Sequence, residues 1–126
     1  MFEVGVVAQF EAAHRLVGNF GPAQRVHGHT YRVEATVHGP ILKTDGTLFD
    51  ITLLQDALGT VVKQLHYQNL DEIDGLNARN TTAEVVAEYI WQHVAPALTN
   101  VGLIDLRIAV WESPNAWAAV MRELPQ

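Results

Sequence analysis

The sequence predicts an α+β domain in which four antiparallel strands form one sheet and two helices cover one face of it. Two observations support this fold class. Apolar and polar residues alternate with a period of two toward both ends of the 126-residue chain, as in strands with one buried face. Between these segments, apolar residues recur every three or four positions in two stretches, as in amphipathic helices. The predicted order is β-β-α-α-β-β.

The first two strands are predicted at residues 2–14 and 27–37, with a loop-like stretch at residues 18–24 between them. Every second residue of each strand is apolar or histidine, and residues two apart share one face. The first strand places Phe2, Val4, Val6, Ala8, Phe10, Ala12 and His14 on that face, and the second places His27, His29, Tyr31, Val33, Ala35 and Val37 there. Both strands are therefore expected to bury one side.

The helices and the last two strands follow a turn at residues 43–46. The first helix carries the apolar stripe Leu54, Leu58, Val61, Val62 and Leu65. The second begins at Thr81-Thr82-Ala83-Glu84, which has the pattern of a capping box, and turns Val85, Val86, Tyr89, Ile90, His93 and Ala97 inward. Alternation returns in a third strand at residues 104–112 and a fourth at residues 117–124, with a turn at residues 113–115.

Charge and composition restrict the function classes. Eight Lys and Arg against fourteen Asp and Glu give a net charge of −6, which argues against a general binder of nucleic acid or anionic membranes. The absence of cysteine excludes a disulfide scaffold, a thiolate zinc site and a cysteine nucleophile. No apolar run approaches the ~18 residues of a membrane span. The first residues lack a basic leader, unlike a signal peptide. We therefore expect a soluble, cytoplasmic single domain comprising residues 1–126.

Three histidines form the strongest candidate site. His27 and His29 point to the same face of one strand, and His14 ends the strand before it. If these strands pair antiparallel, the three imidazoles meet at one end of the sheet. Three neutral imidazoles leave one position of a tetrahedral zinc site open, as in catalytic zinc sites. The alternative is ordinary core histidines with hydrogen-bonded nitrogens. We predict a metal site, zinc first by ligand type, and assign no such role to His38 or His93.

A carboxylate and two threonines are candidate ligand contacts. Glu112 continues the inward-facing series of the third strand, where burying a carboxylate is costly unless it is paired. One hypothesis is that Glu112 accepts paired N–H donors from a ligand such as a pterin or guanine ring. The other is that the strand ends at Val110 and Glu112 is solvated. Capping accounts for one of Thr81 and Thr82, which leaves the other to face a ligand at the helix N-terminus.

Four motifs together resemble the 6-pyruvoyltetrahydropterin synthase / 6-carboxytetrahydropterin synthase family over nearly the whole chain. They are Phe10-Glu11-Ala12-Ala13-His14, His27-Gly28-His29, Thr82-Ala83-Glu84 and Val110-Trp111-Glu112. The resemblance implies the tunnelling (T-) fold, a homotrimer or homohexamer with active sites between subunits, and pathways such as queuosine biosynthesis. It also implies zinc on His14, His27 and His29, and a pterin held by Glu112 with help from Thr81 and Thr82.

The chain departs from this family in its acid–base residues. The usual catalytic cysteine lies four residues before the H-G-H motif, where this chain has Ala23. The family's Asp-His pair precedes a stretch that resembles Leu70-Asp71-Glu72-Ile73. Without a gap, His66 and Tyr67 stand at that pair; with a one-residue gap, Leu65 and His66 do. His66 and Tyr67 are therefore the candidate catalytic residues. The alternative is that Tyr67 is a half-buried ring at the end of the first helix and that His66 is a C-terminal helix residue favoured by the helix dipole. Further candidates are Asp71, Glu11, Gln24 and Arg25.

Three functions remain open at this point. The first is a zinc-dependent lyase with non-cysteine acid–base residues, acting on 7,8-dihydroneopterin triphosphate or a related pterin. Within this class, aldolase-like cleavage needs only zinc and one base, whereas triphosphate elimination needs more proton movements. The second is a diverged zinc enzyme with another small substrate. The third is a non-catalytic paralogue that binds a pterin or zinc.

Overall fold

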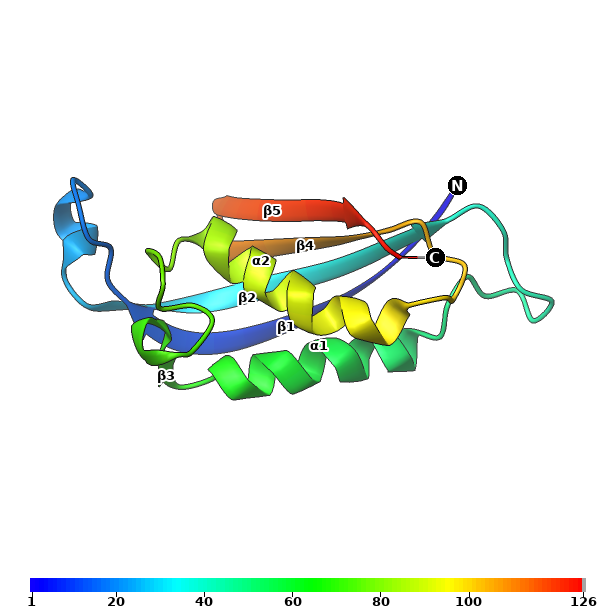
Figure 1. Cartoon of the computed structure of the whole chain (residues 1–126), viewed down its shortest axis with the longest axis horizontal. Helices are drawn as coiled ribbons and strands as arrows, with labels where there is room; N and C mark the ends of the chain where they lie inside the picture. Colours follow the sequence, from blue (N-terminus) through cyan, green and yellow to red (C-terminus); the bar gives the residue numbers. More distant parts are fainter. Residues whose placement is uncertain (126) are drawn as a thin grey trace.

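The computed structural model describes residues 1–125 as a five-stranded sheet with two helices on one face (Figure 1). The strands are β1 (Phe2–His14), β2 (His27–Gly39), β3 (Gln68–Asn69), β4 (Asp105–Ser113) and β5 (Ala116–Glu123), in the spatial order β3-β1-β2-β4-β5. The helices are α1 (Ile51–Leu65) and α2 (Ala83–Val94). Neither helix has the length and apolar character that crossing a membrane requires.

The predicted fold class is confirmed, but the predicted strand count is not. The additional strand, β3, pairs parallel with the end of β1 through Ala12↔Gln68 and Ala13↔Asn69. A two-residue strand is too short to show an alternation, so the sequence pattern contained no indication of it. The four longer strands pair antiparallel, as expected.

The pairing of β1 with β2 is in register along the full length of both strands. It begins at Phe2↔Gly39 and ends at His14↔His27. The face predicted to be inward is the buried one, because Phe10, Tyr31 and Val33 are each at most 1% exposed. Since side chains alternate between faces, this register places His14 and His27 on the same side as the core.

Helix α1 buries the stripe predicted from its sequence, whereas α2 differs in two respects. The N-cap of α2 is Thr82, whose hydroxyl accepts a hydrogen bond from the Val85 amide, so a capping box starting at Thr81 is wrong. His93 and Ala97 are exposed rather than inward. After Val94 the chain continues as a 3-10 helix (Ala95–Leu98), whose tighter turn brings Leu98 and not Ala97 into the core.

Candidate metal centre

The three predicted histidines meet at the end of the β1–β2 ladder. His14 and His27 are directly opposite each other, and His29 lies two residues further along the same face. One potential ligand atom from each residue lies within 4.8 Å of those of the other two. The ring centroids are 4.6, 5.1 and 4.8 Å apart for the pairs 14–27, 14–29 and 27–29. The first two strands thus pair antiparallel, and the three imidazoles meet at one end of the sheet as that pairing requires.

In His14 and His27, the ring nitrogen on the side away from the cluster is hydrogen-bonded, so the other ring nitrogen remains available. His14 Nδ1 lies 2.8 Å from the Thr81 carbonyl, and His27 Nδ1 lies 2.7 Å from the Arg25 carbonyl. A carbonyl oxygen only accepts, so Nδ1 carries the proton in both rings and Nε2 keeps its lone pair. Protein atoms of residues 1–125 provide no partner for the buried Nε2 atoms of His14 and His29. His14, His27 and His29 together provide the donor set of a three-histidine metal centre.

Burial also favours the neutral form of His14, which is 1% exposed. Its pKa is lowered mainly by burial, while the hydrogen bond to Thr81 and the charge of Glu112 act in the opposite direction. A neutral imidazole is the form that binds a metal ion. The buried and partly buried rings therefore fit a metal ion held by His14, His27 and His29.

Glu112 is half-buried near this cluster. Strand β4 continues to Ser113, so the hypothesis that the strand ends at Val110 is wrong. The register of β4 with β5 shifts between Trp111 and Ser113, and such irregularities redirect a side chain. The charge of Glu112 acts to raise the pKa of both His14 and Tyr31.

The two threonines have different surroundings. Thr82 caps α2, as described above. Thr81 is fully buried, and its hydroxyl donates to Asp71 Oδ1 at 2.7 Å and lies 3.1 Å from His14 Nδ1. Thr81 therefore supports His14 from behind instead of facing open space, and Asp71 joins the surroundings of the site through it.

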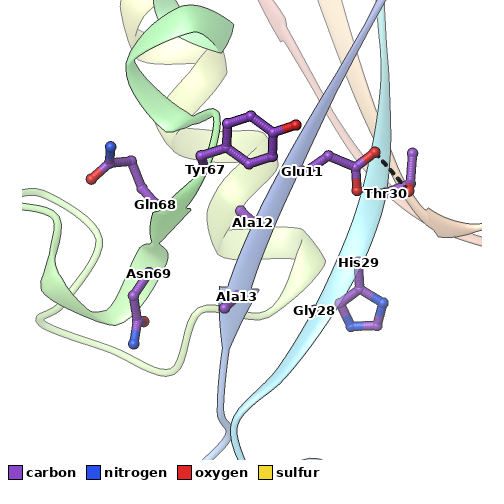
Figure 2. A pocket seen from close by; sticks show the side chains of 9 residues that line it. All are labelled: Glu11, Ala12, Ala13, Gly28, His29, Thr30, Tyr67, Gln68 and Asn69. Carbon is purple, nitrogen blue, oxygen red and sulfur yellow. Dashed lines mark hydrogen bonds between the residues drawn. The ribbon is translucent and has the colours of Figure 1, made fainter.

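A cavity of about 490 Å³ lies beside His29, between the ends of β1, β2 and β3 (Figure 2). Its lining includes the carboxylate of Glu11, which accepts hydrogen bonds from Thr30 at 2.8 and 2.9 Å, and the ring of Tyr67. Tyr67 is 78% exposed and has a left-handed backbone, with φ of 59°. The interpretation of Tyr67 as a half-buried ring at the helix end is therefore wrong.

His66 differs from Tyr67 in that it does not line this cavity. It is the C-cap of α1, and its Nδ1 accepts a hydrogen bond from the Glu11 amide at 3.0 Å. The His66 ring stacks on Tyr67 with a centroid distance of 3.9 Å. Of the two catalytic candidates, only Tyr67 lines the same cavity as a predicted metal ligand, His29.

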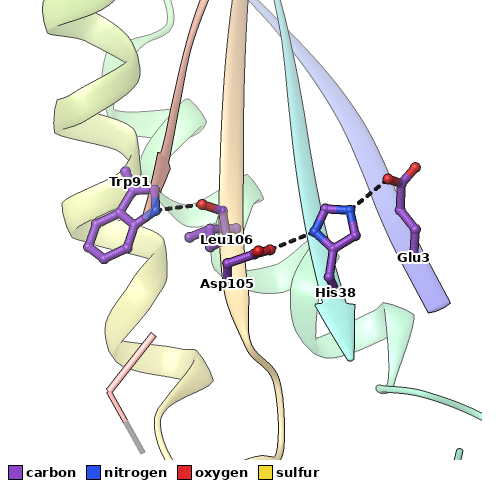
Figure 3. Close-up of polar contacts among 5 residues, drawn as sticks. All are labelled: Glu3, His38, Trp91, Asp105 and Leu106. Carbon is purple, nitrogen blue, oxygen red and sulfur yellow. Dashed lines mark hydrogen bonds and ion pairs between the residues drawn. The ribbon is translucent and has the colours of Figure 1, made fainter. Parts of the chain in front are cut away.

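The other residues considered in the sequence analysis lie away from the histidine cluster or contact it only through the backbone. Ala23 and Gln24 belong to a 3-10 helix (Gly21–Gln24) in the loop between β1 and β2, and Arg25 contributes its carbonyl to His27. His38 lies at the far end of β2, where Asp105 and Glu3 bind its two ring nitrogens (Figure 3). His93 donates to the Tyr89 carbonyl, so neither of these two histidines approaches the cluster.

Sequence reasoning missed Tyr31 as a residue of the site. It is fully buried, and its ring centroid lies 5.3 Å from that of His29 and 6.2 Å from that of His14. Burial raises the pKa of its hydroxyl, and the charges of Glu112 and Asp71 raise it further. The indication was available, because Tyr31 follows His27 and His29 in the same alternation.

Comparison with known proteins agrees with this fold. A family model described as 6-pyruvoyl tetrahydropterin synthase matches residues 3–123. A 6-pyruvoyl tetrahydrobiopterin synthase of Drosophila melanogaster is 37% identical over 91 residues, 71% of this chain and 54% of its own length. This chain thus spans about half of that relative.

Two further relatives are covered over more of their length. A 6-carboxy-5,6,7,8-tetrahydropterin synthase of Synechocystis is 33% identical over 92 residues, 70% of each chain. A dihydroneopterin monophosphate aldolase of Pyrococcus furiosus is 33% identical over 106 residues, 83% of this chain and 84% of its own. The solved structure of Caenorhabditis elegans 6-pyruvoyl tetrahydropterin synthase superposes with a TM-score of 0.83 at 24% identity, covering 97% of this chain and 96% of that one. That likeness confirms the expected T-fold.

Proposed function

The chain belongs to the 6-pyruvoyl tetrahydropterin synthase family, and on that premise we propose that it is a zinc-dependent lyase acting on the side chain of a dihydropterin. The observation that carries the proposal is the histidine cluster, in which two buried Nε2 atoms have no partner among residues 1–125. His14, His27 and His29 would hold the zinc. Zinc bound there supplies a Lewis acid for side-chain oxygens of the substrate. The proposed substrate is 7,8-dihydroneopterin triphosphate or a related pterin.

Glu112 is the proposed anchor of the pterin ring. A carboxylate can accept two parallel N–H bonds from the aminopyrimidine edge of a pterin, and hydrogen bonds to a charged acceptor are strong. Glu112 is half-buried, and its charge acts on His14, so a ring bound there lies next to the cluster. Thr82 is a second proposed contact, because its hydroxyl accepts from the Val85 amide and still has a proton to donate.

Tyr67 is the proposed acid–base residue, in the role that a cysteine has elsewhere in the family. It lines the cavity that contains His29, and a phenol can both donate and accept a proton. Its left-handed backbone is costly for a bulky side chain, and strain of this kind is concentrated at functional sites. His66 is better placed to position Tyr67, since its ring stacks on that residue while its Nδ1 is bound to the backbone.

Side-chain cleavage by an aldolase-type reaction is the second candidate within this class. It requires zinc and a single base, which the cluster and Tyr67 together would provide. The similarity to a relative named as a dihydroneopterin monophosphate aldolase supports it. Triphosphate elimination requires more proton transfers, and this chain has no cysteine to assist them.

A homotrimer or homohexamer with sites between subunits is the proposed assembly. Within residues 1–125, β5 pairs only with β4, and most of β1 has a partner only in β2. Unpaired strand edges are available for continuing a sheet into a neighbouring copy.

The proposed function is tested by incubating the zinc-loaded protein with dihydroneopterin triphosphate and, separately, with the monophosphate. Mass spectrometry is expected to detect a pyruvoyl-, carboxy- or side-chain-cleaved pterin. His29→Ala should abolish turnover, whereas the matched variant His38→Ala should not, because His38 lies at the far end of the same strand. Unchanged substrate in the presence of folded, zinc-bound protein would refute the lyase and favour a non-catalytic paralogue.

A further inference from the structure

We infer that Asp71 and Thr81 are positioning residues of the metal centre: together they hold the proton on Nδ1 of His14 and raise the basicity of its Nε2, and they thereby set the affinity of the cluster for zinc. The inference deepens the function proposed above and rests on it for the identity of the metal. Its evidence is a continuous chain of contacts. Asp71 Oδ1 accepts from the Thr81 hydroxyl at 2.7 Å, and that hydroxyl oxygen lies 3.1 Å from His14 Nδ1.

The direction of each hydrogen bond in this chain follows from the donor inventory. The Thr81 hydroxyl has a single proton, and the Asp71 carboxylate only accepts, so the proton points to Asp71. Toward His14, both the hydroxyl oxygen and the carbonyl of Thr81 then act as acceptors. His14 must donate from Nδ1 to satisfy them. Its Nε2 is left unprotonated and directed away from Thr81, which is the state required of a ligand.

Asp71 is itself held in place at the end of β1. Its second carboxylate oxygen, Oδ2, accepts from the backbone amide of Arg15 at 2.8 Å, and its own amide donates to Asn69 Oδ1 at 3.0 Å. Arg15 directly follows His14 in the chain. Asp71 therefore contacts the residue after the ligand through one oxygen and the residue behind the ligand through the other. The carboxylate thus links the backbone that follows His14 to the Thr81 hydroxyl behind the His14 ring.

The charge of Asp71 acts on the Thr81 hydroxyl through their hydrogen bond. A carboxylate that polarises a hydroxyl strengthens it as an acceptor, and a stronger acceptor at Nδ1 raises the basicity of Nε2. Loss of such an outer partner lowers the metal affinity of a protein site about 10–100-fold. Without Asp71, the Thr81 proton is free to turn toward His14 Nδ1 and to favour the opposite tautomer.

Two pairs of variants separate this role from simple loop anchoring. Asp71→Ala is matched by Asn80→Ala, because Asn80 also ties its loop to the chain after β1, through the amide and carbonyl of Val17, but does not contact His14. Thr81→Val is matched by Thr81→Ser, which restores the hydroxyl. Zinc affinity is measured by competition with a chromophoric chelator. The His14 tautomer is measured by nitrogen-15 NMR of the metal-free protein.

Asp71→Ala and Thr81→Val are expected to weaken zinc binding about 10–100-fold, while Asn80→Ala and Thr81→Ser stay close to the wild type. In the metal-free protein, Asp71→Ala should show a mixture of His14 tautomers. Thr81→Val should retain the Nδ1–H form, because the carbonyl of residue 81 remains and no hydroxyl proton competes for Nδ1, so its weaker zinc binding reports the lost acceptor. Equal zinc affinity of Asp71→Ala and Asn80→Ala, or an unchanged tautomer in Asp71→Ala, would overturn the inference. If the wild type fails to bind zinc, the proposed function fails, and the NMR result still decides the role of Asp71.

Discussion

Tyr31→Phe is expected to stabilise the metal-free protein, against the usual direction of core substitutions. Tyr31 is fully buried, and no atom of residues 1–125 is a hydrogen-bond partner for its hydroxyl. Leaving a buried hydroxyl unpaired costs about 1–3 kcal/mol. Phenylalanine removes that penalty and keeps the stacking on Phe10, whose ring centroid lies 4.8 Å away. For a chain of this size, each kcal/mol gained should raise Tm by about 3–5 °C.

The assay is calorimetric melting of the wild type and the variant in the presence of a chelator. Tyr31→Ala serves as the control, since it removes the ring as well and should lose about 3–5 kcal/mol through the cavity. A lower Tm for Tyr31→Phe would refute the reasoning, because it would mean that the hydroxyl has a partner in solution. Burial raises the pKa of this hydroxyl, so it remains a donor beside the cluster at neutral pH. We therefore also expect Tyr31→Phe to reduce turnover.

Glu112→Gln should weaken binding of a dihydropterin by about 1.5–3 kcal/mol in titration calorimetry, since a charged acceptor is lost; unchanged affinity would indicate a non-pterin substrate. The pKa of His38 is raised chiefly by its hydrogen bond to Asp105, with a further contribution from Glu3. The stabilisation by these pairs is complete below the unfolded pKa of about 6.5 and is lost as pH rises through the folded pKa. The advantage of the wild type over His38→Gln in unfolding free energy, about 1 kcal/mol or less, should therefore shrink as the pH rises above about 6.5, and an advantage that grows would contradict this. Thr82→Ala should cost about 1 kcal/mol of unfolding free energy in urea titrations, whereas Glu84→Ala should cost little; the reverse order would favour capping by Thr81.

The strands could be predicted well because the alternation of apolar and polar residues that marks them lies within short stretches of the sequence. Alternation alone locates β1 at residues 2–14, as observed, and places three histidines on one face. The antiparallel pairing that brings them together then follows from two consecutive strands. The apolar stripe of α1 could be predicted for the same reason, because a period of 3.6 residues is recognisable from residues close together in the sequence.

The hydrogen bonds that hold the histidine cluster in place could not be predicted from such local patterns. Thr81 meets His14 across a separation of 67 residues, and Asp71 meets Arg15 across 56. No periodicity connects such positions, because the contacts depend on how α2 and the preceding loop dock on the sheet. Tyr67 illustrates a related limit: its left-handed backbone turns the ring outward, and a helical pattern that ends at Leu65 contains no information on that turn.

The in-register pairing of β1 with β2 places the three histidines on the strands and not in the loop that joins them. Thirteen successive residue pairs hold the imidazoles in place, whereas Ala23 lies in the loop and Tyr67 lies beyond α1. A slip of one residue would turn His14 to the other face, but an insertion in the loop would leave it where it is. The three histidines and the candidate acid–base positions thus lie on separate segments. Substitutions within residues 16–24 and 66–69 can change those candidate positions while the three histidines keep their places on β1 and β2.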